Sequence, residues 1–223
     1  VIARKMIQNG IDALILEGNE AGGHIGPVSV NVLVQEILPH IKEVPIFVAG
    51  GIGRGEIILK FLQLGAAGCQ IGTRFVCANE SIAHSKFKNI FIKSEARNAQ
   101  ISVKIDDRLP VIPVRAIENS ATQNFISEQK KLINLVEKKE ISLKDAQLSI
   151  EHFWAGSLKK AVIDGDVESG SLMAGQSVSL VKKLQSVSEI FNELTQQMKS
   201  QINFEQKDSN NGCLLYTSDA ADE

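Results

Sequence analysis

The sequence lacks long apolar runs, an excess of one charge and a metal-binding pattern of cysteines. No stretch of its 223 residues stays apolar over the roughly 18 positions of a membrane-spanning helix, so we expect no membrane partner. Lys and Arg number 24 and Asp and Glu 26, a near-neutral balance that argues against a nucleic-acid surface. Cys69 and Cys77 lack the spacing of metal ligands. We therefore expect no metal site, no disulfide scaffold and a reducing, cytoplasmic setting.

The two ends of the chain look unlike the middle. There is no initiator methionine, and residues 4–9 read as the end of a helix whose strand is missing. Residues 213–223 read as the in-frame translation of a transposase-type sequencing adapter. Because residues 204–212 are polar and rich in Asn, Gln and Asp, we expect residues 204–223 to form a disordered tail.

Short apolar runs alternate with segments of helical period over the first third of the chain. Residues 11–16 form a mainly apolar run that is typical of a buried parallel strand. Residues 46–49 form an apolar strand that closes on a Gly-Gly turn, and residues 68–71 are expected to be another short strand that ends in a Gly-Thr turn. Apolar residues recur at helical spacing over residues 30–41 and 54–64. The pattern predicts an α/β fold, a parallel sheet with crossover helices. A (β/α)₈ barrel fits best, and a doubly wound sheet is the main alternative.

Each expected strand is followed by a glycine turn with functional potential. The turn at residues 18–26 contains His24, Gly50-Gly51 follows the second strand, and Gly72-Thr73 follows the third. Backbone N–H groups at such strand-to-helix turns suit a phosphate dianion. The alternative is that these are ordinary tight turns and that His24 is structural.

Four motifs together resemble the flavin-dependent nitronate monooxygenase family, which also contains the FMN-dependent (type II) enoyl-acyl-carrier-protein reductases. The first two are Glu-Ala-Gly-Gly-His-Ile-Gly at residues 20–26 and Val-Ala-Gly-Gly-Ile at residues 48–52. The other two are Gly-Ala-Ala-Gly-Cys-Gln-Ile-Gly-Thr-Arg-Phe at residues 65–75 and Gly-Asp-Val-Glu-Ser-Gly-Ser-Leu-Met-Ala-Gly-Gln at residues 165–176. They occur in the family's order. The resemblance covers the chain from residue 11 to about residue 200.

The resemblance implies that the three strands correspond to strands 6 to 8 of a TIM barrel in a truncated chain. Residues 1–116 would be the C-terminal portion of an FMN-binding barrel, and residues 117–203 a helical segment packing on it. Helical periods over residues 118–138, 143–154 and 187–202 agree with this, and residues 171–176 read as a helix start near the substrate side of the flavin. We expect the fragment itself to be inactive.

The resemblance also implies a cofactor, FMN, and a set of site residues. His24 would lie over the flavin as general base or acid, because an imidazole exchanges protons near neutral pH. The expected cofactor contacts are Gly22 and Gly23 near the isoalloxazine, Gln70 as a polar contact, and Gly50, Gly51, Gly72 and Thr73 at the phosphate.

Two reactions share this expected core. A nitronate monooxygenase passes an electron from an alkyl nitronate to FMN and uses O₂ to release a carbonyl compound and nitrite. An enoyl reductase passes hydride from a nicotinamide through FMN to an enoyl thioester, and Glu17, the His24-Ile25-Gly26 form and residues 165–176 look closer to that branch. We favour the monooxygenase, which needs only flavin, histidine and oxygen. The other readings are a non-catalytic flavin- or phosphate-binding module and a non-flavin barrel enzyme, and a homodimer is left open.

Overall fold

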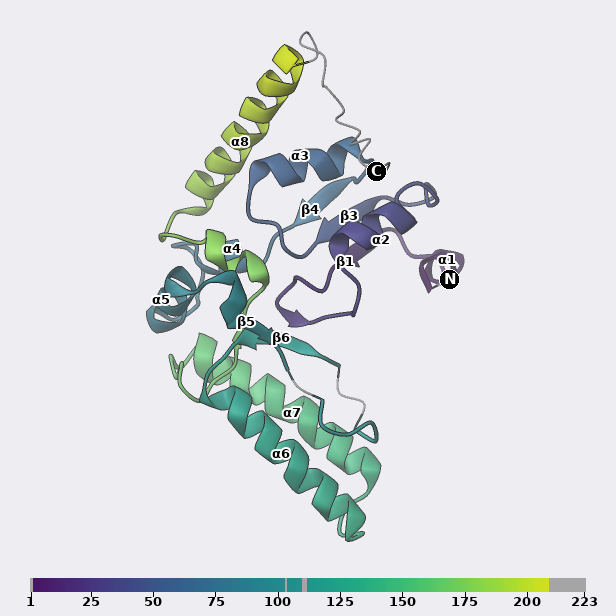
Figure 1. The fold of residues 1–223 in the computed structure, drawn as a ribbon, viewed down its shortest axis with the longest axis vertical. Coiled ribbons are helices and arrows are strands. Elements are labelled where there is room, and N and C mark those ends of the chain that lie inside the picture. Colours follow the sequence, from purple (N-terminus) through teal and green to yellow (C-terminus); the bar gives the residue numbers. More distant parts are fainter. Residues whose placement is uncertain (1, 103, 110–111, 209–223) are drawn as a thin grey trace, which may run out of the picture.

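A three-stranded parallel sheet lies at the centre of the N-terminal half of the computed structural model, which describes residues 2–102, 104–109 and 112–208 (Figure 1). Strands β1 (Leu14–Glu17), β3 (Ile46–Ala49) and β4 (Gly68–Gln70) lie in that order. Helices α2 (Val30–Ile37) and α3 (Gly55–Gln63) connect them, and a short α1 (Ile2–Gln8) precedes them. The predicted alternation of parallel strands and helices is confirmed. Its assignment to strands 6 to 8 of a barrel stays a prediction.

Alternate residues of the strands form one apolar core with helix α2. Leu16 pairs in register with Val48, and both are buried against Val34 of α2. The N-terminus of α2 is held in place because Ser29 accepts a hydrogen bond from the Val32 N–H and the Glu20 carboxylate accepts one from the Val30 N–H. These caps set where α2 begins, and the burial of Val34 holds the helix against one face of the sheet.

A second, antiparallel sheet joins segments that are far apart in the sequence. Strand β6 (Val114–Ile117) pairs with β2 (Gly23–His24), β5 (Ala99–Ile101) and β7 (Leu172–Met173). The expectation of a helix start over residues 171–176 is wrong, because residues 172–173 pair as a strand and a 3₁₀ helix, η2 (Gln176–Leu180), begins only afterwards. His24 likewise lies in a two-residue strand at the end of its glycine turn.

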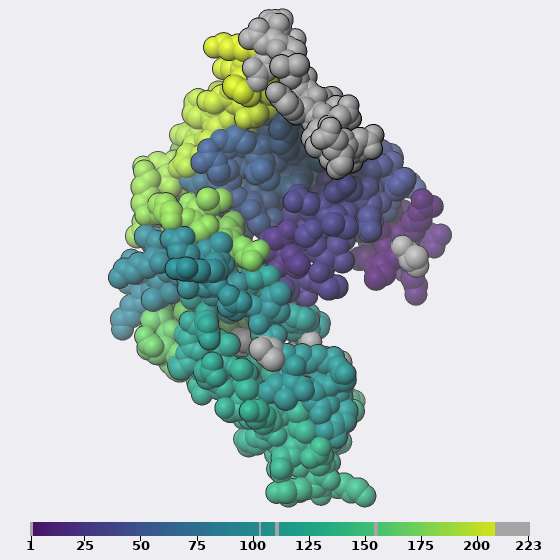
Figure 2. Space-filling model, viewed as in Figure 1, coloured from purple at the N-terminus to yellow at the C-terminus, as the bar shows by residue number. Residues whose placement is uncertain are grey.

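Two long helices pack against the second sheet. Helices α6 (Ser120–Glu137) and α7 (Leu143–Val162) form a hairpin that projects from the rest of the surface (Figures 1 and 2). Short helices α4 (Thr73–Val76), α5 (Ser85–Lys93) and η1 (Ala96–Asn98) connect the two sheets. None of the helices in the described ranges is both long and apolar enough to cross a bilayer.

The last helix, α8 (Val187–Asp208), returns to pack along α3 (Figure 1). It continues five residues into the segment expected to be disordered, so that expectation is wrong for residues 204–208. The reason is a contact with α3, since Glu205 accepts hydrogen bonds from Lys60 and Gln63. The remainder of the expected tail, with the adapter-like segment at residues 213–223, lies outside the described residues.

Candidate active site

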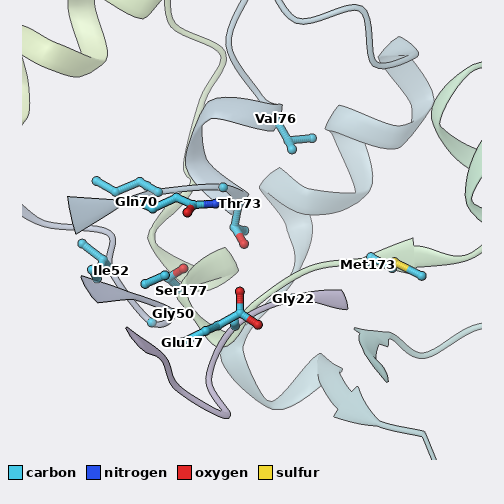
Figure 3. Close-up of a pocket in the computed structure, with 14 residues that line it drawn as sticks. Glu17, Gly22, Gly50, Ile52, Gln70, Thr73, Val76, Met173 and Ser177 are labelled. Atoms are coloured by element: carbon cyan, nitrogen blue, oxygen red, sulfur yellow. The ribbon is translucent and has the colours of Figure 1, made fainter. Parts of the chain in front are cut away.

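A pocket of about 200 Å³ opens at the carboxyl ends of the three parallel strands (Figure 3). This is the edge of an α/β sheet where ligands bind, since the turns that follow the strands meet there. The lining comes from the three strand ends and the turns after them, from helix α4, and from β7 and η2: Glu17, Ala21, Gly22, Ala49, Gly50, Gly51, Ile52, Gln70, Ile71, Gly72, Thr73, Val76, Met173 and Ser177.

The pocket brings together most of the predicted site residues. Those that line it are Gly22, Gly50, Gly51, Gln70, Gly72 and Thr73. The other two, Gly23 and His24, form strand β2 beside the pocket and are absent from its lining. Gly23 is buried, whereas His24 is exposed. The assigned roles of all eight residues stay predictions.

The turn after β3 has a backbone that favours glycine. Gly50 and Gly51 have φ angles of 96° and 70°, in the left-handed region that other residues rarely adopt. Within the described part of the chain, the N–H groups of Gly51 and Ile52 have no hydrogen-bond acceptor. Adjacent unpaired N–H groups in such a turn form a concave site for an anionic oxygen.

The turn after β4 reaches the same pocket from the next strand. A Cβ atom on Gly72 would meet nothing within 4 Å, so the protein's own packing does not require glycine there. The Thr73 Oγ1 accepts a hydrogen bond of 3.0 Å from the Gly175 N–H, which ties the turn to the segment after β7. The N–H groups of Gly72 and Thr73 also lack an acceptor among the residues described. Both turns therefore fit a phosphate.

Gly22 is required by packing of the protein on itself. A Cβ atom on Gly22 would lie 2.5 Å from the carbonyl carbon of Ala174 and 2.5 Å from the Gly175 nitrogen. The Gln176 N–H donates to the Glu20 carbonyl at 2.9 Å in the same contact. The glycine thus lets two backbone segments touch and close one side of the pocket. Its expected approach to a flavin ring stays a prediction.

Among the described residues that line the pocket, Glu17 is the one with a charged side chain. It is the last residue of β1, and Figure 3 shows its carboxylate pointing into the pocket. Glu17 is exposed as a whole residue, yet partial burial of its carboxyl raises the pKa of that group, and the charge of His24 partly offsets the rise. Glu17 was not among the site residues expected from the sequence, where its position counted only as a likeness to the reductase branch, although its place at a strand's carboxyl end is a usable signal.

A buried arginine that the sequence analysis missed supports the turn that carries His24. Arg115 of β6 is 5% exposed, and its Nε donates to the Asn19 carbonyl at 2.9 Å. A second donor reaches the Ala99 carbonyl. Burial lowers the pKa of Arg115, and Glu20 acts in the opposite direction. A lone arginine among apolar strand residues was the available signal, since a buried cation needs such partners.

The donor set fits part of a mononucleotide and does not suit a metal. The described residues include no group of three His, Cys, Asp or Glu side chains placed to bind a metal ion. The pocket's volume is below the roughly 300–1,000 Å³ of typical ligand sites. Its N–H groups and glycine turns suit the phosphate end of FMN.

Comparison with known proteins gives one family. The family model described as nitronate monooxygenase matches residues 2–197. A (3aS,4S,5R,7aS)-5-hydroxy-7a-methyl-1-oxo-octahydro-1H-indene-4-carboxyl-CoA dehydrogenase of Rhodococcus jostii is 28% identical over 205 residues, which cover 82% of this chain and 57% of that protein. A Staphylococcus aureus protein named "Probable nitronate monooxygenase" is 29% identical over 204 residues, covering 85% and 52% of the two chains.

Solved structures resemble the chain as well. FabK from Thermotoga maritima is 30% identical with a TM-score of 0.73, covering 92% of this chain and 60% of that one. A nitroalkane oxidase from Streptomyces ansochromogenes, at 23% identity and a TM-score of 0.65, shows the same fold over 91% of this chain and 56% of its own. The chain thus spans between about half and three fifths of the length of these relatives.

Proposed function

The chain belongs to the nitronate monooxygenase family, and from this premise we propose that it acts as an FMN-dependent oxidoreductase that converts alkyl nitronates and O₂ to a carbonyl compound and nitrite. The family is one of flavin-dependent oxidoreductases. The observation that carries the proposal is the meeting of six expected cofactor residues, from three separate strand ends, in one pocket. A cytoplasmic location and a homodimer remain predictions from the sequence.

The chain's own groups would hold the cofactor and leave the redox chemistry to it. When bound, FMN supplies the electron transfer. The N–H groups after Gly50 and at Gly72 and Thr73 would hold its phosphate, because their residues line the pocket and these N–H groups have no acceptor among the described residues. Gln70 would supply a polar contact from the end of β4.

His24 would handle the proton. Its position on β2 beside the pocket leaves the imidazole exposed, within electrostatic reach of the Glu17 carboxylate. In this role it removes the α-proton of a neutral nitroalkane, which leaves the nitronate anion ready for oxidation. A nitronate supplied from solution needs no such step.

The alternative is an NAD(P)H-dependent enoyl-acyl-carrier-protein reductase, which one observation favours. Among the described lining residues the charged one is the acidic Glu17, which when ionised repels an anionic nitronate but does not repel a neutral thioester. The likeness to FabK at 30% identity supports the same branch. In that reaction His24 would donate a proton to the substrate.

Anaerobic spectroscopy of the natural protein separates the two reactions. The visible absorbance of bound flavin is followed after adding propionate-3-nitronate alone, and in a separate cuvette NADH or NADPH alone. Loss of flavin absorbance with the nitronate supports the monooxygenase. Rapid loss with the nicotinamide alone moves the assignment to the reductase, and a protein that retains no flavin refutes both.

A His24→Ala variant tests the proton-transfer role. We expect kcat/KM for a neutral nitroalkane to fall by about 10²–10⁴-fold, while kcat/KM for the preformed nitronate changes little. His152, an exposed residue of α7, provides the control substitution His152→Ala. Equal losses with the nitroalkane and the nitronate would show that His24 does not act by removing this proton.

A further inference from the structure

A buried arginine links the two glycine turns of the pocket. Arg74 follows Thr73 in α4 and is 5% exposed. Its Nη1 donates a hydrogen bond of 2.8 Å to the carbonyl of Gly53, three residues after Gly50 in the other turn. One side chain thus spans from the turn after β4 to the turn after β3.

The partner of this arginine comes from the C-terminal helix α8. The Arg74 Nη2 forms an ion pair of 2.6 Å with Glu193, whose side chain is 38% exposed. The Gln185 amide, just before α8, donates to the Glu193 carboxylate at 2.9 Å. Hydrogen bonds from Arg74 and Gln185 lower the pKa of Glu193, so the carboxylate stays charged at neutral pH.

The same helix also holds the turn after β3 directly. Gln197 accepts a hydrogen bond of 2.7 Å from the Gly55 N–H and donates one of 3.3 Å to Glu193. A Cβ atom on Gly55 would lie 2.0 Å from the Leu194 carbonyl oxygen, so the α8 backbone lies directly on this turn. Helix α8 contributes no residue to the described lining of the pocket.

We propose that the Arg74–Glu193 ion pair is a positioning device through which α8 sets the relative placement of the two glycine turns that form the phosphate cradle. The N–H groups of the cradle lie within two residues of Gly53 and Arg74, the residues that the bond joins. A phosphate needs donors from both turns at once, so a small change in their separation weakens binding. The cofactor part of this inference rests on the proposed function.

The test compares two carboxylates of α8 in the natural protein. Glu193→Gln removes the charge that faces Arg74 of α4, whereas Glu205→Gln removes the ion pair that Glu205 of the same helix makes with Lys60 of α3, away from the pocket. Amide hydrogen exchange of residues 50–55 and 72–76 and the Kd for FMN, from quenching of flavin fluorescence, are measured for each.

We expect Glu193→Gln to speed exchange in both turns and to raise the Kd for FMN about tenfold, the effect of losing one charge-assisted hydrogen bond. Arg74→Lys should act similarly, because one ammonium cannot replace a guanidinium fork that bonds to Gly53 and Glu193 together. Glu205→Gln should leave both quantities at their wild-type values.

Exchange at wild-type rates in Glu193→Gln, or an equal change in Glu205→Gln, would overturn the inference. If Glu193→Gln does not fold, Glu193→Asp keeps the charge on a shorter side chain, and faster exchange in both turns supports the inference while wild-type exchange overturns it. A wild-type protein that binds no FMN would refute the proposed function, yet the exchange data would still decide on the ion pair.

Discussion

The imidazole of His24 lies close enough to Glu17 for its charge to act on the carboxyl, whose pKa is raised by burial and partly lowered again by that charge. The two residues come from different strands, β1 and β2, and the intervening glycine turn brings them to the same end of the parallel sheet. The acidic residue lines the pocket, and the basic residue lies beside it. The charge of His24 therefore acts on the carboxyl of the pocket wall.

Because the pKa of Glu17 is raised in the folded protein, ionisation of its carboxyl lowers the free energy of unfolding. The folded protein holds the Glu17 proton to a higher pH than the unfolded chain does, so stability falls as the pH rises from the ordinary value of 4.5 through the raised pKa. Glu17→Gln removes this loss of stability, because an amide does not ionise. We expect the variant to have a higher Tm than wild type at pH 7 and an equal Tm near pH 4, measured by thermal unfolding. A lower Tm at pH 7 would show that the ionised carboxylate stabilises the fold.

The parallel sheet could be predicted because its strands carry a strong local signal. Each of the three strands is a short segment that ends close to a glycine, as at Gly18, Gly50 and Gly72, and the most apolar of them, β3, is also the most buried. Helices α2 and α3 repeat their apolar residues over two turns or more, which is enough to show a period. Because parallel strands end at the same edge, the meeting of the three turns followed from the order of elements.

The second sheet and the buried arginines could not be predicted in the same way. Strands β2 and β7 have two residues each, too few to show any period, and only their pairing with β6 makes them strands. Arg115 stands among apolar strand residues, which hints at its burial, but the partners of Arg74 and Arg115 lie far away along the chain. Which groups the two arginines contact therefore depends on the tertiary structure.

The two described cysteines are predicted to be unreactive in the native protein. Burial raises the pKa of Cys69 to about 11, and burial, partly offset by Lys88, raises the pKa of Cys77 to about 11. At pH 8 roughly one thiol in a thousand is then ionised, and the thiolate is the reactive form. Iodoacetamide at pH 8, followed by peptide mapping, should label both residues only after denaturation. Rapid native labelling of Cys69, which is half-buried, would show that its thiolate is accessible in the folded protein.

Gly22→Ala should destabilise the fold, whatever ligand the pocket binds. The added methyl group would lie 2.5 Å from backbone atoms of Ala174 and Gly175, which cannot move aside as a side chain could. We expect a loss of about 1–3 kcal/mol in the free energy of unfolding. Gly26→Ala is the matched control, since its Cβ would meet nothing within 4 Å. Urea denaturation measures both, and equal stability of the two variants would contradict the close contact.

Gly72→Ala should separate ligand binding from stability. The φ of Gly72 is −92° and its Cβ would enter open space, so alanine fits the fold and can add about 0.4–1 kcal/mol by restricting the unfolded chain. The same methyl group would stand in the pocket next to the unpaired N–H groups, so we expect weaker FMN binding at unchanged or higher Tm.

Gly51→Ala should differ from Gly72→Ala, because the φ of 70° at Gly51 costs an L-residue about 1–2 kcal/mol and should lower Tm as well. Flavin titration measures the FMN affinity of both variants, and thermal unfolding measures their Tm. If Gly72→Ala bound FMN with wild-type affinity, the turn at Gly72 would not take part in binding the phosphate.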